Sequence, residues 1–397
     1  MREGALSGVT VIDLTRVLAG PYCSMMLADM GADVIKIELP GKGDDSRAHY
    51  PQVNGESAYY MNLNRNKRSM TLNLKSEAGK KVLLQLVEKA DILLENYRPG
   101  VMERLGLGYE SLKEVNPGLV YGCVSGFGHY GPYSQRPGYD IIGQAMGGLM
   151  STTGWPDGMP TRSGTAISDV MGGISLTVGV LAAYIKKRET GAGQLVDVSL
   201  VDSVVSSLEI INQIYLMEGR IPERIGNRYE ASYPYDSFRT RDGMLVIGCG
   251  NDKLFKLLTD LMGQPGLRDD PRFCTNVERV KHHAALKPIL EDWLAQYDTQ
   301  TAVELILAAG VPAGPINNIK QVAEDPHIAG AREMFVEMEH PVAGKIKITG
   351  NQIKLSETPV TYRSPAPLLG QHTEEILQDF LGYSARDCES LRAGGVL

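Results

Sequence analysis

The chain has 397 residues, of which 43% are apolar and 22% are charged. This composition is typical of a soluble globular protein, and the length predicts about two domains. The net charge of −7 argues against a nucleic-acid partner that binds through bulk charge. The five cysteines include no CxxC pair, and the seven histidines form no HxxxH or HExxH motif. We therefore expect no disulfide framework, no metal site and a reducing environment.

The first residues contain no apolar region of the kind found in signal peptides. The longest apolar run, from about 172 to 185, is too short to span a bilayer. We therefore expect a cytoplasmic protein without membrane contact.

The first half of the chain alternates apolar strands with amphipathic helices. Strands are predicted over 9–14, 33–38, 70–74, 91–95, 119–125 and 195–200, and helices over 21–30 and 76–90. Strand, helix and strand within the first 38 residues form a compact βαβ unit. This alternation predicts an open α/β domain with a parallel sheet.

The pattern of predicted elements changes after a long helix predicted over 201–218. Asp242-Gly243 predicts a hairpin between strands at 235–239 and 244–248, and helices are expected over about 252–262, 281–296 and 299–309. A further strand is expected at 345–349 and a helix at 373–381. We therefore expect a large domain over 1–224, a smaller α+β domain over 225–330, and a segment over 331–397 that returns to the large domain.

The stretch from Pro137 to Gln194 contains the most informative helix. Ser168 and Asp169 are expected to cap it, because their side-chain oxygens can accept the free N–H groups of a first turn. Cations at 186–188 suit its last turn, and Gly191 is expected to end it. Taken alone, an Asp at such a place is most often only a cap.

Two glycine-rich loops deserve a chemical interpretation. Gly126–Gly131 (GFGHYG) matches the GxGxxG pattern and follows a strand, but Pro132 and Pro137 leave no room for the helix that a dinucleotide site needs. A turn-rich loop lining a pocket is the better interpretation, and a Rossmann-type NAD(P) oxidoreductase is kept as an alternative. Gly248-Cys249-Gly250-Asn251 lets the backbone approach a ligand, although an ordinary strand-to-helix turn has the same pattern.

Eight stretches in the same order resemble the class III CoA-transferase (CaiB/BaiF) family. They are residues 11–47, 64–79, 90–109, 116–133, 137–154, 169–194, 310–318 and 366–377. The resemblance implies a Rossmann-like large domain built from both chain ends, a smaller α+β domain and an interlocked homodimer. It implies coenzyme A and acyl-CoA as substrates, with no permanently bound cofactor.

The same resemblance implies the site residues. Asp169 is the nucleophile at the matching position, with Tyr139 and Asp140 beside it and the loop of Gly248 and Gly250 as a cover. The residues implied to contact CoA are Leu18, Ala19, Leu72, Asn73, Leu74, Lys75, Asn96, Tyr97, Arg98, Arg104, Tyr139 and Asp140.

Three departures from the formyl-CoA transferase pattern argue against oxalate or formate as the acid. Leu18 replaces a polar Gln, Leu39 replaces an Arg, and the glycine loop is poorer in glycine. A C4–C5 dicarboxylate with succinyl-CoA as donor is therefore expected, with Arg16 or Arg47 as a partner of the distal carboxylate. A structural ion pair is the alternative role for either arginine.

Two further functions stay open. Racemases of 2-methylacyl-CoA share this family, but they carry a histidine base where this chain has Tyr139, and a phenol of pKa near 10 is a poor base at neutral pH. A non-catalytic CoA-binding protein is the other alternative. For the transferase, a carboxylate nucleophile divides the reaction into easier covalent steps, and the helix dipole is expected to lower the pKa of Asp169 by a fraction of a unit.

Overall fold

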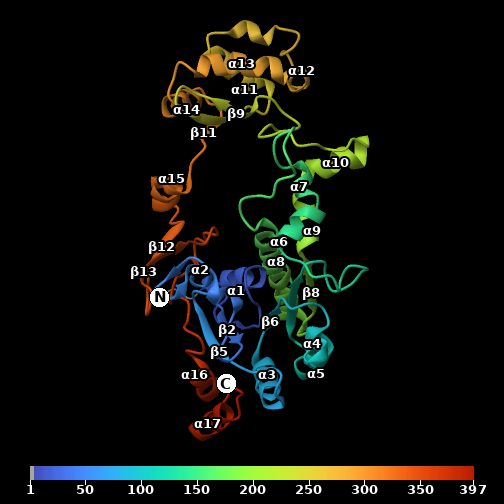
Figure 1. Ribbon diagram of the computed structural model, residues 1–397, viewed down its shortest axis with the longest axis vertical. Helices are drawn as coiled ribbons and strands as arrows, with labels where there is room; N and C mark the ends of the chain where they lie inside the picture. Colours follow the sequence, from blue (N-terminus) through green and yellow to red (C-terminus); the bar gives the residue numbers. More distant parts are fainter. Residues whose placement is uncertain (1–3) are drawn as a thin grey trace. The chain divides into compact units, whose positions relative to one another are not determined.

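The computed structural model describes residues 4–397 (Figure 1). The chain divides into two compact units. The first contains residues 4–149, 162–213 and 330–397, and the second contains residues 150–161 and 214–329. Each unit is built around its own apolar core.

The first unit is organised by a six-stranded sheet in which every pairing is parallel. Counted along the chain, its strands lie in the order 3-2-1-4-5-6, which is the doubly wound arrangement of dinucleotide-binding folds. The predicted Rossmann-like α/β fold is confirmed. The strands are β1 (Thr10–Asp13), β2 (Asp33–Glu38), β5 (Lys67–Thr71), β6 (Ile92–Glu95), β7 (Val120–Ser125) and β8 (Leu195–Ser199).

Alternate residues of the strands face two different cores. Val11 and Val34 pack with α1 (Ala19–Asp29) and α8 (Ile167–Thr190) on one face. Ile12 and Ile35 pack with α3 (Glu77–Lys89) and α5 (Tyr109–Val115) on the other. Apolar residues therefore fill consecutive positions, as expected for a parallel sheet covered on both faces.

The end of the chain packs against the sheet's second face. Ile376, Leu377 and Val396 belong to the same core as Ile12 and Ile35. Thr71 N–H donates to Thr373 Oγ1 at 3.0 Å, and Asn73 N–H donates to the carbonyl of Val396 at 2.8 Å. Figure 1 draws this C-terminal segment, in red, beside the N-terminal strands in blue. The large unit is thus built from both ends of the chain.

The remaining elements of the first unit are short or peripheral. Its helices are α2 (Ala58–Leu63), α4 (Val101–Arg104), α6 (Asp140–Met146), α9 (Leu200–Ser207), α16 (Thr373–Glu375) and α17 (Ala385–Ala393), with a π-helical turn over Ile376–Phe380 and a 3-10 turn over Asp45–Ala48. Its small antiparallel pairs are β3 (Gln52–Val53) with β4 (Glu56–Ser57), and β12 (Phe335–His340) with β13 (Gly344–Thr349).

Helix α8 is longer than its apolar run suggested. At 24 residues, it is long and apolar enough to cross a membrane by length and composition alone, whereas the apolar run of about 172–185 was expected to be too short. It nevertheless packs on the sheet, where a Cβ added to Gly122 would lie 2.7 Å from Val180 Cγ1. Gly191 ends the helix in the left-handed conformation at φ 75°, as predicted.

The second unit is a small α+β structure. The predicted hairpin is β9 (Tyr235–Arg239) with β10 (Met244–Gly248), and β11 (Ala313–Pro315) pairs with the free edge of β10. Phe238, Leu245 and Ile247 pack with helices on a common core. These helices are α11 (Asp252–Leu261), α12 (Asn276–Lys281), α13 (His283–Leu294) and α14 (Thr299–Ala308). The other elements in this part of the chain are α7 (Leu149–Thr152), α15 (Ile319–Glu324), a 3-10 turn (Pro265–Arg268) and a π-helical turn (Pro326–Ala331).

One helix predicted from the sequence is two helices in the structure. The segment expected as a single helix over 201–218 consists of α9 (Leu200–Ser207) and α10 (Glu209–Glu218), which meet at an angle of 76°. Glu209 has φ 24° and breaks the helical path. No Pro or Gly marks this break in the sequence, which is why the pattern did not reveal it.

Candidate active site

The first unit has a cavity where the strand order reverses. In a doubly wound sheet, ligands bind beyond the carboxyl ends of the strands at this switch point, which here lies between β1 and β6. A cavity of about 220 Å³ occurs there, lined by the loops that follow both strands. Asp169 lines the same cavity. The topology therefore brings the predicted nucleophile to the place where this fold binds its ligands.

A second cavity, of about 530 Å³, adjoins the first. Both are lined by Arg16, Tyr97 and Arg98. The residues implied to contact CoA line one or both of these cavities, except Asp140, which lines neither. Leu18, Ala19, Asn96 and Tyr139 line the first, and Leu72, Asn73, Leu74, Lys75 and Arg104 line the second.

The two cavities are rich in positive charge, although the chain as a whole is acidic. Lys75, Arg98, Arg104 and Arg136 line one or the other, and no ion pair occupies any of them within residues 4–397. Arg16 makes only a 3.4 Å ion pair with the half-exposed Asp45. Unpaired guanidinium and ammonium groups of this kind are suited to phosphate groups.

Arg47 has a different role from Arg16. Its Nε and Nη2 donate to the two oxygens of the buried Glu38 carboxylate, each at 2.7 Å. Nη2 also donates to the Tyr60 hydroxyl at 2.6 Å and to the carbonyl of Pro367 at 3.1 Å. This guanidinium is fully engaged in structural contacts, whereas the guanidinium of Arg16 borders both cavities.

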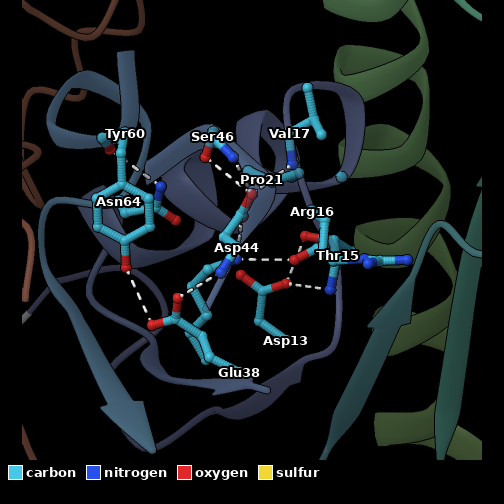
Figure 2. A network of polar contacts seen from close by, with 12 residues as sticks. Asp13, Thr15, Arg16, Val17, Pro21, Glu38, Asp44, Ser46, Tyr60 and Asn64 are labelled. Atoms are coloured by element: carbon cyan, nitrogen blue, oxygen red, sulfur yellow. Dashed lines mark hydrogen bonds and ion pairs between the residues drawn. The ribbon is translucent and has the colours of Figure 1, made fainter. Parts of the chain in front are cut away.

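A buried polar network holds the loop that follows β1 (Figure 2). Lys36 Nζ lies 2.9 Å from Asp44 Oδ2, and both side chains are fully buried. Lys36 Nζ also donates to the carbonyl of Thr15 at 2.7 Å, and Val17 N–H donates to Asp44 Oδ1 at 3.1 Å. Val17 has φ 68°, which a β-branched residue adopts only under strain. The network therefore fixes an unfavourable turn directly before Leu18 and Ala19.

The loop after β6 is joined to the same turn. Asn96 Oδ1 accepts the N–H of Arg16 at 2.8 Å, and Asn96 Nδ2 donates to the carbonyl of Arg16 at 2.7 Å. The Arg16 guanidinium lies 5.0 Å from the centre of the Tyr97 ring. The two cavity walls at the switch point are thus held in one fixed arrangement.

Asp169 lies in the first turn of α8 but does not cap it. The helix begins at Ile167, its N-cap position is Ala166, and no side chain of that residue satisfies the first turn. The prediction that Ser168 and Asp169 are caps was wrong, by two residues for Ser168 and by three for Asp169. Within residues 4–397, no hydrogen bond or ion pair holds the Asp169 carboxylate, which leaves it available for chemistry.

Burial, followed by the charge of Asp140, raises the pKa of Asp169 to about 7. The expected lowering by the helix dipole is therefore outweighed, because removing a carboxylate from water costs more than the first turn of a helix returns. A carboxyl group with this pKa is partly protonated at neutral pH. A perturbed pKa in a cavity is a common property of catalytic groups.

Asp140 supplies the cap that α8 lacks. Its Oδ1 accepts from both the N–H and the hydroxyl of Ser168, each at 2.9 Å, and its Oδ2 accepts from Gln144 Nε2 at 2.7 Å. Tyr139, the preceding residue, is 73% exposed and lines the first cavity. Asp140 thus holds the start of α8, while Tyr139 borders the ligand space.

Close packing fixes α8 against the cavity. A Cβ added to Gly173 would lie 2.6 Å from the carbonyl oxygen of Ala19. Only glycine permits this approach of α8 to α1. The first turn of α8 is thereby kept beside the turn that carries Leu18.

Two side chains near Asp169 were missed from the sequence. Arg136 lines the first cavity and stacks on Tyr133, with its guanidinium carbon 3.6 Å from the ring centre. Burial and the charges of Asp169, Asp44 and Asp140 raise the pKa of Tyr59 to about 12. Arg136 lies between two of the stretches that carry the family resemblance, 116–133 and 137–154, and a single arginine there gave no sign of its place.

The remaining predicted residues are in loops. Gly126–Gly131 forms turns with no helix before Asp140, so the helix N-terminus of a dinucleotide fingerprint is missing there. Gly248 and Gly250 belong to the second unit, where Asn251 caps α11 by accepting from Leu254 N–H. A Cβ at Gly250 would meet no atom within 4 Å, so its backbone borders open space.

Comparison with known proteins shows the family to which this chain belongs. Residues 6–373 match the model of CoA-transferase family III. The chain belongs to this family. It is 42% identical to the acetyl-CoA:oxalate CoA-transferase of Acetobacter aceti, over 97% of this chain and 98% of that protein.

Other relatives agree. The chain is 40% identical to the human succinyl-CoA:glutarate CoA-transferase, over 99% of this chain and 90% of that protein. A CaiB/BaiF family protein from Brucella suis has a solved structure with TM-score 0.83 and 38% identity, covering 95% of this chain and 100% of that one. The resemblance read from the sequence is confirmed, and the protein is an enzyme that transfers CoA between an acyl-CoA and an acid.

Proposed function

We propose that the protein moves CoA from succinyl-CoA to a small dicarboxylic acid through an aspartyl-CoA thioester on Asp169. The observation that carries this proposal is the placement of Asp169: a half-buried carboxylate without a partner within the described residues, in a cavity lined by basic groups at the switch point of the sheet. The cavities supply cations for the CoA phosphates, and Asp169 supplies a nucleophile.

The reaction divides into four balanced steps. The ionised carboxylate of Asp169 attacks the thioester carbon of the donor, the C–S bond breaks, and CoA thiolate leaves behind a mixed anhydride. The thiolate then attacks the aspartyl carbonyl, releases the donor acid and forms aspartyl-CoA. The acceptor carboxylate attacks this thioester, and the released thiolate attacks the acceptor's carbon of the new anhydride. Asp169 is regenerated, and each step exchanges activated acyl bonds of similar energy.

The neighbouring residues support these steps in different ways. Asp140 positions the first turn of α8 through Ser168. Tyr139 borders the acyl group. As a cover over the site, the loop of Gly248 and Gly250 would stabilise an oxyanion through the backbone N–H of Gly250, because the N–H of Gly248 donates to the carbonyl of Pro312 at 2.9 Å. Because a reactive anhydride is hydrolysed by water, such a cover also protects the intermediate.

The dicarboxylate is inferred from the arginines and from relatives. Arg16 borders both cavities, and its ion pair with Asp45 is long, at 3.4 Å. Arg136 offers a second cation in the cavity of Asp169. Relatives at about the same identity are named for oxalate, glutarate and D-citramalate. Leu18 makes the cavity wall less polar than a Gln would, which favours a C4–C5 acid over oxalate.

We also propose an interlocked homodimer. Tyr215, Leu216 and Met217 at the end of α10 are 56%, 64% and 77% exposed, and consecutive exposed apolar residues of this size favour a protein partner. Light scattering coupled to size exclusion should give twice the chain mass. A monomeric mass would refute this part of the proposal.

The test of the mechanism is to trap the intermediate. The enzyme is incubated with succinyl-CoA, treated with hydroxylamine or borohydride, and digested for mass mapping. The modification should lie on Asp169 and be lost in Asp169→Asn. Asp202→Asn is the matched control, because Asp202 is the exposed third residue of α9 as Asp169 is the third residue of α8. A label on another residue, or normal turnover by Asp169→Asn, would refute the mechanism.

A screen of acceptor acids tests the substrate. Succinyl-CoA is offered with oxalate, glutarate, mesaconate, citramalate and monocarboxylates of matching length, and the new thioester is identified by mass. A preference for the C4–C5 diacids is expected. A preference for oxalate or for monocarboxylates would refute the substrate assignment and leave the nucleophile untouched.

A further inference from the structure

A buried polar cluster behind the first cavity takes no part in the proposed reaction. It consists of Glu95 at the end of β6, Cys123 in β7 and His129 in the loop that follows β7. One oxygen, sulfur or nitrogen of each lies within 4.8 Å of the others. Glu95 Oε1 and His129 Nε2 are 3.6 Å apart. The cluster therefore joins two segments that form different walls of the cavity.

Glu95 holds the first wall. Its Oε2 accepts from the N–H of Tyr97 at 2.7 Å. Tyr97 and its neighbours Asn96 and Arg98 line the first cavity, and Asn96 is bonded to the backbone of Arg16. A change in the position of the Glu95 carboxyl is thus passed directly to the cavity surface.

His129 belongs to the second wall. The backbone N–H of His129 donates to Asp197 Oδ2 at 2.9 Å. The loop around it closes on itself, because a Cβ added to Gly138 would lie 2.6 Å from the Cα of Gly126. Gly126, Gly138 and Tyr139 all line the first cavity. The loop and His129 therefore form a single packed unit.

The charges of the cluster require a proton. Glu95 is 1% exposed, and no Lys or Arg within residues 4–397 forms an ion pair with it. The titratable groups around it are Tyr121 and Cys123 of β7, Asp197 of β8, Glu103 of α4 and His129. His129 Nε2 is buried and has no hydrogen-bond partner in the described part of the chain. The Glu95 carboxyl group, which pairs with no Lys or Arg in the described residues, thus faces His129 Nε2, which has no hydrogen-bond partner there.

We propose that Glu95 and His129 share one proton and clasp the two walls of the CoA cavity, so that both act as positioning residues for CoA. A proton held between Oε1 and Nε2, which lie 3.6 Å apart, gives Nε2 its missing partner and gives Oε1 a partner besides the Tyr121 hydroxyl, which donates to it at 3.4 Å. The inference rests on the proposed function, because it takes the cavity to be the CoA site.

The clasp should open at alkaline pH. Burial, then the charges of Glu103 and Asp197, raises the pKa of Glu95 to about 8, against the opposing bonds from Tyr97 N–H and the Tyr121 hydroxyl. When the shared proton leaves, a buried carboxylate faces the charges of Asp197 and Glu103. Repulsion and the cost of an unpaired buried charge then separate the walls.

The test measures CoA binding by calorimetry without turnover, at about pH 6.5 and about pH 9, on either side of the Glu95 pKa. His129→Leu should bind CoA about tenfold more weakly at the lower pH, equivalent to about 1.4 kcal/mol. Glu95→Gln keeps a donor for His129 and cannot ionise. Its affinity should stay within about threefold of the wild type at low pH and lack the alkaline loss.

Controls separate the possible causes. His327→Leu alters an exposed histidine of the second unit and should bind CoA as the wild type does. Circular dichroism checks that each variant folds. Wild-type affinity in His129→Leu, or an alkaline loss in Glu95→Gln equal to that of the wild type, would refute the clasp. Weakening of wild-type binding by a chelator, reversed by Zn²⁺, would also refute it, because a metal would then link the three ligands. Absence of CoA binding in the wild type would refute the proposed function instead.

Discussion

Asp140 Oδ1 accepts two hydrogen bonds of 2.9 Å from Ser168, one from its N–H and one from its hydroxyl, and Ser168 is the residue before Asp169. This contact gives α8 a cap from a neighbouring helix. It also places a second negative charge close enough to Asp169 to raise its pKa. The position and the acidity of Asp169 are thus coupled through one carboxylate, that of Asp140.

The rate should depend on pH through Asp169. Only the ionised carboxylate attacks a thioester, so kcat/KM should rise with pH and level off above about 7. Asp140→Asn removes one of the two causes of the raised pKa and keeps an oxygen for Ser168. The acidic limb of the kcat/KM profile should therefore move to lower pH. A limb that stays in place or moves upward would contradict the assignment of Asp169.

Asp169→Asn should make the protein more stable at neutral and alkaline pH. The pKa of Asp169 is higher in the folded chain than in the unfolded one, so its contribution is fully present below about pH 3.8 and is lost as pH rises through about 7. The Asn variant lacks this loss, and a gain on the order of a few kcal/mol is expected at about pH 8. Urea titration at about pH 5 and about pH 8 measures it, with Asp202→Asn as the control. An equal stability difference at both values would contradict the prediction.

The sequence alone was sufficient for the sheet and the family. The apolar strands and the helix around Asp169 have strong local patterns, and eight ordered stretches carried the resemblance. The cap from Asp140 could not be foreseen, because it joins residues 28 positions apart. The raised pKa of Asp169 likewise depends on burial, which a local motif does not reveal. The break at Glu209, where φ is 24°, has no Pro or Gly to mark it in the sequence.

Arg16 and Arg47 should separate into a functional and a structural residue. Arg16→Gln removes an exposed cation that borders both cavities, so KM for substrates should rise about tenfold or more while unfolding changes by less than about 0.5 kcal/mol. Arg47→Gln removes the guanidinium charge and both of its hydrogen bonds from the buried Glu38 carboxylate, and a loss of about 3 kcal/mol or more is expected. Steady-state kinetics and urea unfolding measure the two effects. Arg188→Gln, an exposed arginine at the end of α8, is the control. A reversed pattern would show that Arg47 is the substrate residue.

Asp44 and its neighbour Asp45 provide a matched test of the network below the CoA cavity. Asp44 is fully buried against Lys36, whereas Asp45 is 39% exposed and pairs with Lys42 at 2.7 Å. Although burial opposes it, Lys36 holds the pKa of Asp44 well below its usual range. The stability from this pair is therefore present above the unfolded pKa near 3.8 and is lost as pH falls below it.

Asp44→Asn should accordingly destabilise the protein by about 3–5 kcal/mol at neutral pH, because it leaves Lys36 buried without its counter-charge. The strained turn at Val17 is held by the same carboxylate, so KM for acyl-CoA should rise as well. Asp45→Asn, which removes two exposed ion pairs, with Lys42 and with Arg16, should cost less than about 1 kcal/mol. Urea unfolding at about pH 7 and steady-state kinetics decide the matter. Equal effects of the two substitutions would mean that the buried pair does not hold the turn in place.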